Sequence, residues 1–348
     1  MNHHACLNKF FRLVWSAARG GWMAVAETAR GRGKSGTRRG RGMTAAALVG
    51  AGLSSLHGLA LAGAAPPAPT QLPTGGQVVA GQATLHQGGA TLAVQQASQR
   101  AVIDWKTFDL GSQARVDFLQ PNASAVTLNR VLDANASQIF GRISAPGQVF
   151  ITNPNGVLFG ATAQVDVGGL VATTLALGND DFMAGSTTFG AGATSVRGAA
   201  VVNQGTLGAR LGGYIALLAP EVRNEGVIVA REGTVALAAG EQVTLQFDGR
   251  RPVAVRVDRA ALDALVDNRH AIRADGGLVV LVASSANALL DTVISNSGTL
   301  RADTLAQRGG RIVLEGGALG VVAVSGTLQA RGNAAGEVGG AVLASGDK

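Results

Sequence analysis

Residues 148–160 read QVFITNPNGVLFG, where two apolar runs, VFI and VLF, flank the tetrapeptide Asn153-Pro154-Asn155-Gly156. Each residue of the tetrapeptide suits its place in a type I turn. Asn153 can cap the turn with its side chain, Pro154 presets φ, Asn155 tolerates the bridge region, and Gly156 frees the exit. The pattern predicts a strand, a tight corner and another strand. Alone, the tetrapeptide is a common turn, so any further interpretation rests on its flanks.

The composition favours an elongated repeat protein over a compact globule. The chain has 348 residues, of which 50 are glycine, and 47% are hydrophobic but only 4% aromatic. A compact core of this size normally draws on more Phe, Tyr and Trp. Many short strands joined by tight turns fit this composition better.

The net charge of +7 is concentrated at the front of the chain. Residues 1–64 contain nine Lys or Arg and one acidic residue, whereas the remainder contains 20 basic and 21 acidic residues. Because the body is close to neutral, a basic surface is not supported there, and we expect no nucleic-acid partner. The single cysteine, Cys6, also lies in the front segment, so the body has no cysteine for a disulfide.

Residues 1–64 have the order of a secretory signal. A basic stretch is followed by the uncharged run 44–62 and by A-x-A sites at 60–62 and 62–64. This order predicts Sec-type export and removal of the signal near residues 62–65. A retained membrane anchor and a basic RNA-binding segment are the alternatives. Residues 65–76, APPAPTQLPTGG, are expected to be the flexible start of the mature chain.

From residue 201 onward the chain contains an internal repeat. Four asparagines, spaced by 21, 44 and 28 residues, are each followed by a Gly-x-x-x-Leu segment. Such a unit cannot bury its own inward face, so we expect coils of about 21 residues to stack at about 4.8 Å. Each asparagine is expected at a corner, bonded to the next asparagine and to turn backbone, beside a glycine that permits φ > 0. These corner positions are Asn203, Asn224, Asn268 and Asn296.

The spacing of 44 residues leaves room for an extra coil or an insertion before Asn268. Residues 257–268 read VDRAALDALVDN, with apolar residues at helical spacing, so a short helix is expected to project from the rod. His270 replaces the usual glycine of the repeat. A structural substitution is favoured there over a metal or catalytic role.

Several segments around the opening stretch resemble a known family. FITNPNGVLFG is preceded by VTLNRVLDANASQIFGRISAPGQV (126–149) and followed by VDVGGLVATT (165–174), and IDWKTF occupies 103–108. Together they resemble the N-terminal secretion domain of filamentous-haemagglutinin-like exoproteins of two-partner secretion. Residues 1–36 are similar to the extended signal-peptide region found on large exoproteins.

The resemblance implies an all-β protein that is secreted by, or displayed on the surface of, a Gram-negative bacterium. The implied fold is a right-handed parallel β-helix, for which we expect a small capping sheet and the short helical insertion. The implied partner is an outer-membrane β-barrel transporter with periplasmic domains. In this interpretation Asn153 to Gly156 are either read by that transporter or form a purely structural turn. A host-cell receptor or glycan is a further candidate partner.

The expected organisation follows from the signal, the motif and the repeat. We expect an extended signal peptide over 1–64 and the mature N-terminus over 65–76. A secretion domain is expected over 77–200, and β-helix repeats that begin a longer rod over 201–348. The chain lacks the cysteine pair of one branch of the family and the Asn-Pro-Asn-Leu motif of some members.

The sequence offers few residues that could form a catalytic site. Past the signal there are two histidines, His86 and His270, no cysteine, and no nucleophile elbow or HExxH motif. Asp180-Asp181 lacks the alternating acidic loop of a calcium site and is interpreted as a solvated turn. We therefore expect no enzyme, no metal and no cofactor.

Three hypotheses remain for the function. The first is an exported adhesin or haemagglutinin that passes through its transporter unfolded and folds outside. The second is the N-terminal delivery part of a contact-dependent inhibition toxin, which would share these features. The third is a β-helical enzyme acting on polysaccharide, which would need a line of carboxylates and basic residues on one external face.

Overall fold

The computed structural model describes residues 11–16, 21–26, 65–192, 196–249, 251–286, 292–305, 307–334 and 336–346. The chain divides into two units, Met1–Leu56 and His57–Lys348. In the first unit, β1 (Phe11–Ser16) pairs antiparallel with β2 (Gly21–Ala26). The uncharged run and the cleavage sites of the predicted signal lie outside the described residues. Within the described part of the chain, no helix is long and apolar enough to span a membrane.

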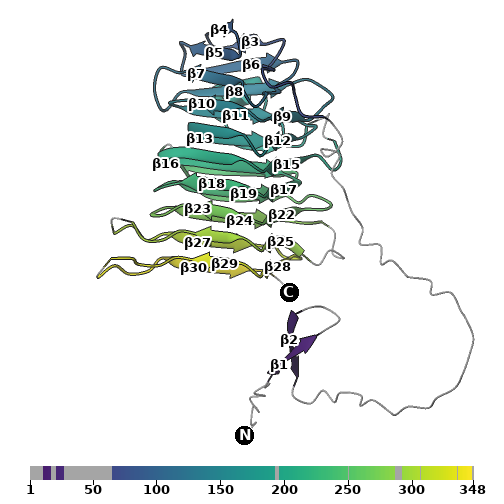
Figure 1. Ribbon diagram of the computed structural model, residues 1–348, viewed down its shortest axis with the longest axis vertical. Coiled ribbons are helices and arrows are strands. Elements are labelled where there is room, and N and C mark those ends of the chain that lie inside the picture. Colours follow the sequence, from purple (N-terminus) through teal and green to yellow (C-terminus); the bar gives the residue numbers. More distant parts are fainter. Residues whose placement is uncertain are drawn as a thin grey trace, which may run out of the picture. The chain divides into compact units, whose positions relative to one another are not determined.

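The second unit is a parallel β-helix, as expected, in which the chain winds through three sheet faces (Figure 1). The first face contains β5 (Thr91–Gln96), β7 (Arg115–Leu119), β10 (Arg142–Ser144), the first part of β13 (Gln164–Thr173), the first part of β16 (Thr206–Ala219), β18 (Val227–Ala230), β23 (Ala271–Arg273), β26 (Thr299–Arg301) and β29 (Thr327–Gln329). The second face contains β6 (Arg100–Trp105), β8 (Val126–Val131), β11 (Gln148–Thr152), the later parts of β13 and β16, β19 (Thr234–Ala239), β24 (Leu278–Ala283), β27 (Arg311–Glu315) and β30 (Ala341–Ser345). The third face contains β9 (Ser137–Ile139), β12 (Val157–Phe159), β15 (Ala200–Asn203), β17 (Glu221–Asn224), β22 (Leu265–Asn268), β25 (Thr292–Asn296) and β28 (Val321–Val324). Coils before and after residue 200 share the same sheets.

The interior is built from equivalent side chains that stack from coil to coil. Strands alternate their side chains between two sides, so one side of each short strand faces the axis. On the second face, one row of buried apolar residues runs in register along the rod. Its members are Val149, Leu170, Ile215, Val235, Val279 and Ile312. No single coil could bury this row, so stability depends on stacking.

The outer side of the second face is also apolar, and a separate layer covers it. This layer consists of α1 (Asn179–Ala184) and an antiparallel sheet of β14 (Thr188–Gly190), β20 (Gln242–Asp248) and β21 (Arg251–Arg259). Phe150 points outward into it, with its ring 6.0 Å from that of Phe182 and 5.9 Å from that of Phe189. Burial on both sides explains why β11 is a continuous apolar run rather than an alternating one.

The helix predicted over 257–268 is wrong. β21 extends to Arg259, β22 begins at Leu265, and the insertion that lengthens this repeat is the β20–β21 hairpin. Of the four apolar residues at helical spacing, Ala261 and Val266 are buried in the interior, whereas Leu265 is partly buried and Leu262 is exposed. The described helix lies at α1 instead, and the Asp180-Asp181 pair stands in its first turn, where carboxylates suit the helix dipole.

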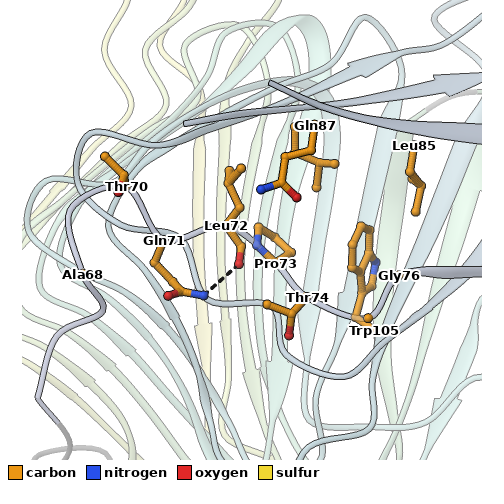
Figure 2. Close-up of a pocket in the computed structure, with 12 residues that line it drawn as sticks. Ala68, Thr70, Gln71, Leu72, Pro73, Thr74, Gly76, Leu85, Gln87 and Trp105 are labelled. Carbon is orange, nitrogen blue, oxygen red and sulfur yellow. Dashed lines mark hydrogen bonds between the residues drawn. The ribbon is translucent and has the colours of Figure 1, made fainter. Parts of the chain in front are cut away.

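The N-terminal end carries the expected small cap. β3 (Gln77–Ala80) pairs antiparallel with β6, and β4 (Ala83–Gly88) pairs antiparallel with β5. Residues 65–76 were expected to be flexible, but their backbone is bonded to the first coils. Thr74 N donates to Thr107 O (3.0 Å), and Gly111 N donates to Gln71 O (2.9 Å). A cavity of about 500 Å³ lies between this segment, β4 and the buried Trp105 (Figure 2).

Candidate functional site

The tetrapeptide at 153–156 forms the predicted tight turn between β11 and β12. Gly156 N donates to Asn153 O across the turn at 3.0 Å, and Asn155 N donates to the Asn153 side-chain oxygen at 2.9 Å. Gly156 has φ +119°, a conformation that glycine adopts without strain. The turn directs β12 onto the third face, where it pairs with β9 and β15.

Asn153 is fully buried, at 0% exposure, and all of its polar groups are bonded. Its Nδ2 donates to Asn135 O and to Ser137 Oγ, each at 3.0 Å. Its backbone N–H donates to Thr173 O of the next coil at 3.0 Å. A buried amide whose partners are removed costs free energy, so this side chain fixes the turn to the preceding coil, while the backbone N–H bonds to the next coil.

Pro154 and Asn155 are the partly exposed members of the turn. Asn155 Nδ2 donates to Asp133 O at 2.7 Å, and Ser137 N donates to Gly156 O at 3.0 Å. The turn therefore packs against residues 133–137 of the preceding coil. In the folded protein the amide of Asn153 is closed to any partner, and only Pro154 and Asn155 reach solvent.

The four corner asparagines form the predicted ladder, and each is buried. Asn203 Nδ2 donates to Asn224 Oδ1 (2.8 Å), Asn224 Nδ2 to Asn268 Oδ1 (2.7 Å), and Asn268 Nδ2 to Asn296 Oδ1 (2.6 Å). The turn bond is present at the start of the ladder, where Gly205 N donates to Asn203 Oδ1 at 3.1 Å. The ladder is thus a structural element of the third face. The side-chain amides in its middle, those of Asn224 and Asn268, are bonded to a neighbouring asparagine on both sides.

The glycines beside the ladder serve a different purpose from the one expected. Gly226, Gly298 and Gly326 do not have positive φ; instead each lies against the backbone of the coil before it. A Cβ at Gly226 would lie 2.2 Å from Gly205 O, and one at Gly298 would lie 2.0 Å from His270 O. Close backbone approach, rather than a left-handed turn, therefore favours glycine at these three positions. His270 is exposed, and its carbonyl accepts a bond from Asn268 Nδ2 at 3.4 Å.

A second corner ladder, of carboxylates, was not found from the sequence. Asp275 Oδ1 accepts from Asp303 N (3.1 Å), and Asp303 Oδ1 accepts from Arg331 N (2.7 Å), so each aspartate caps the backbone of the next coil. The signal that could have revealed it is the tripeptide Arg-Ala-Asp, which occurs at 273–275 and again 28 residues later at 301–303. Burial alone would raise the pKa of Asp303, but the bonds from Arg331, Asn333 and Gln329 outweigh it and lower that pKa.

Acidification is expected to weaken the fold through Asp303. Because its pKa is lowered in the folded state, its stabilisation is present above the unfolded-state pKa of about 3.9 and is lost as the pH falls through the folded-state pKa. In urea unfolding at a series of pH values between about 5 and 2, Asp303→Asn should lose less unfolding free energy than the wild type.

Asp109 supplies the control of opposite sign. Burial raises the pKa of its carboxyl in the folded state, so acid favours the folded form at this position. Asp109→Asn should therefore lose more stability on acidification than the wild type. Equal acid losses in the wild type and Asp303→Asn would contradict the role given to the carboxylate ladder.

A buried polar network near β8 and β11 was also missed. Gln120 Nε2 donates to Thr127 Oγ1 and to Gln148 O, both at 2.9 Å, and the Tyr214 hydroxyl donates to Gln148 Oε1 at 2.6 Å. Burial raises the pKa of the Tyr214 phenol, so it stays a neutral donor. Among the described residues, no three His, Cys, Asp or Glu side chains gather as a metal site would require.

Comparisons with known proteins agree with the fold and with the extended signal peptide. A family model for the TPS secretion domain matches residues 70–338, and one for the Extended Signal Peptide of the Type V secretion system matches residues 8–56. A Heme/hemopexin-binding protein of Haemophilus influenzae Rd is 34% identical over 252 residues, which are 70% of this chain and 27% of that protein. A second Heme/hemopexin-binding protein of Haemophilus influenzae is 43% identical over 113 residues, 32% of this chain and 12% of that protein.

The structural comparison gives the same result. The secretion domain of HMW1 from Haemophilus influenzae superposes with a TM-score of 0.67 and 28% identity, covering 79% of this chain and 74% of that one. The chain spans about a quarter or less of the length of the curated relatives it matches.

Proposed function

The chain belongs to the family of TPS secretion domains, the exported partners of two-partner secretion, and from this membership we propose that its transporter reads the Asn153 to Gly156 region while the chain is unfolded. The extended signal peptide and the secretion domain indicate Sec export followed by secretion or surface display. The family is one of exported domains and not a known enzyme family.

The burial of Asn153 is the observation that carries this proposal. Its amide bonds to Asn135 and Ser137 within the protein, so a partner in the periplasm can use that amide only before the coils close. An unfolded segment with free strand edges can add to a sheet edge of the transporter's periplasmic domains. Once outside, each coil gains its interior only by stacking on the one before, which makes folding progressive and helps to keep export directional.

A binding comparison tests this order of events. A peptide of residues 133–160 is expected to bind the isolated periplasmic domains of the transporter about tenfold more tightly than the folded chain does. The reason is that the peptide exposes uncharged hydrogen-bond donors that are already bonded within the folded chain. Fluorescence anisotropy with each partner in turn would measure both affinities. A peptide with Asn153→Ala serves as the control and should bind no better than the folded chain. Binding of the folded chain as tightly as the peptide would overturn the proposal.

The ligand of the whole exoprotein is a separate question. The relatives carry the name heme/hemopexin-binding protein, yet this chain spans only 27% and 12% of them. We propose that the described β-helix is the export module of an adhesin-type exoprotein and that its folded surface is free to meet a host-cell receptor or glycan. A delivery module of a contact-dependent toxin would use the same export step.

A further inference from the structure

The outer side of the first face bears a polar groove of about 550 Å³. Its walls come from β7, β10, β13 and the start of β16, four neighbouring parallel strands. The groove is lined by Arg115, Asp117, Arg142, Ser144, Gln164, Asp166 and Thr206, with Ile143 and Val165. Whereas the covering layer packs on the outer side of the second face, the polar side chains of the groove are exposed or partly exposed, and those of Ile143 and Val165 are buried in the interior.

The groove residues form two parallel rows because the strands are in register. Arg115, Arg142, Gln164 and Thr206 follow one another across the four strands, and Asp117, Ser144 and Asp166 form the row beside them. Successive members of a row are about 4.8 Å apart along the rod. This interval is close to the length that one sugar residue adds to an extended polysaccharide, so a chain lying along the rod would meet one rung per sugar.

The charged side chains in the groove differ in how closely they are paired with an opposite charge. Asp117 is bound by Arg115 at 2.6 Å and by the Ser144 hydroxyl at 2.7 Å, so this carboxylate is neutralised. Asp166 has Arg210 at 4.0 Å. Among the described residues, the Arg142 guanidinium has neither an ion pair nor a side-chain hydrogen bond, and it is exposed. It also stands directly in register with Arg115, and like charges in such positions repel.

We propose that this groove binds an extended acidic polysaccharide, with a carboxylate or sulfate of the polymer at Arg142. The planar guanidinium offers two parallel donors, which match either anion. The amide of Gln164 and the hydroxyl of Thr206, both without a side-chain hydrogen bond within the described chain, bond to sugar hydroxyls on the next rungs. The site belongs to the folded chain and does not depend on how the transporter reads the turn at 153–156.

The test is a titration of the purified full chain at physiological ionic strength. The probes are hyaluronate oligosaccharides, which carry only carboxylates, heparin oligosaccharides, which add sulfates, and neutral dextran. Binding to hyaluronate assigns the site to carboxylates, whereas binding to heparin alone assigns it to sulfates. Arg142→Gln is expected to weaken the binding that is seen about tenfold, the loss of one charge-assisted contact.

Arg273→Gln is the matched control, because Arg273 is an exposed arginine on the same face, on β23, outside the groove. Its binding should stay close to that of the wild type. Equal weakening by Arg142→Gln and Arg273→Gln would show that only overall charge matters and would overturn the proposal. Binding of dextran as strong as that of both acidic polymers, or no binding of either acidic polymer, would overturn it as well.

Discussion

Replacing Asn224 with alanine is expected to lower the free energy of unfolding by about 2–5 kcal/mol. Asn224 is fully buried in the middle of the ladder, accepting from Asn203 at 2.8 Å and donating to Asn268 at 2.7 Å. Alanine can bond to neither neighbour, so the substitution leaves one buried donor on Asn203 and one buried acceptor on Asn268 without a partner. Each orphaned group costs about 1–3 kcal/mol.

Alanine substitutions at two other asparagines are compared with this loss of stability, and each is expected to have a smaller effect. Asn296→Ala removes the last rung, whose oxygen serves Asn268 and whose Nδ2 donates to Gly298 O at a longer 3.3 Å, so a smaller loss is expected. Asn122→Ala, in an exposed loop where the side chain caps only Ser124 N, should change stability by less than about 0.5 kcal/mol. Chemical denaturation of the three variants would measure the order. A loss for Asn224→Ala no larger than that for Asn122→Ala would contradict the ladder as a source of stability.

Features that depend on local chemistry or on a repeat were predictable from the sequence. The turn at 153–156 follows from residue types that favour a corner, and the structure has that turn. The ladder follows from asparagines that recur at coil spacing, because stacking brings equivalent positions together whatever the interior contains. Both inferences needed only the order of residues along the chain.

The insertion at 257–268 shows where such reasoning fails. The apolar residues at 261, 262, 265 and 266 have a spacing that suits a helix. In the structure Leu265 and Val266 begin the strand β22, and of the four only Ala261 and Val266 are buried. Short apolar segments do not distinguish the period of a helix from that of a strand. Pairing with the coils above and below determines that this segment forms a strand. The β20–β21 hairpin could not be placed either, because no sequence pattern shows which outer side it covers; in the structure β21 packs against β16, β19 and β24.

The groove at Arg142 could not be predicted from the sequence for the same reason. Arg115, Arg142, Gln164 and Thr206 are separated by 22 to 42 residues and resemble no motif. Only the register of four parallel strands brings them into one row.

Replacing Asn153 with alanine is expected to lower secretion of the chain about tenfold, because a transporter that reads this region loses the amide it contacts in the unfolded segment. The same change must also weaken the fold, since Asn153 is fully buried and its side chain bonds to Asn135, Ser137 and Asn155. Stability and recognition therefore have to be separated. Asn224→Ala does this, because it removes a buried asparagine of similar bonding from a corner that the transporter is not proposed to read.

The most direct measurement is the amount of each variant in the culture medium and in the periplasm of cells that produce the transporter, together with the unfolding free energy of each purified protein. The account predicts that Asn153→Ala accumulates in the periplasm while Asn224→Ala, destabilised to a similar degree, reaches the medium at close to the wild-type level. Equal secretion of the two variants, whether both are high or both are low, would contradict recognition of the turn and leave it a purely structural corner.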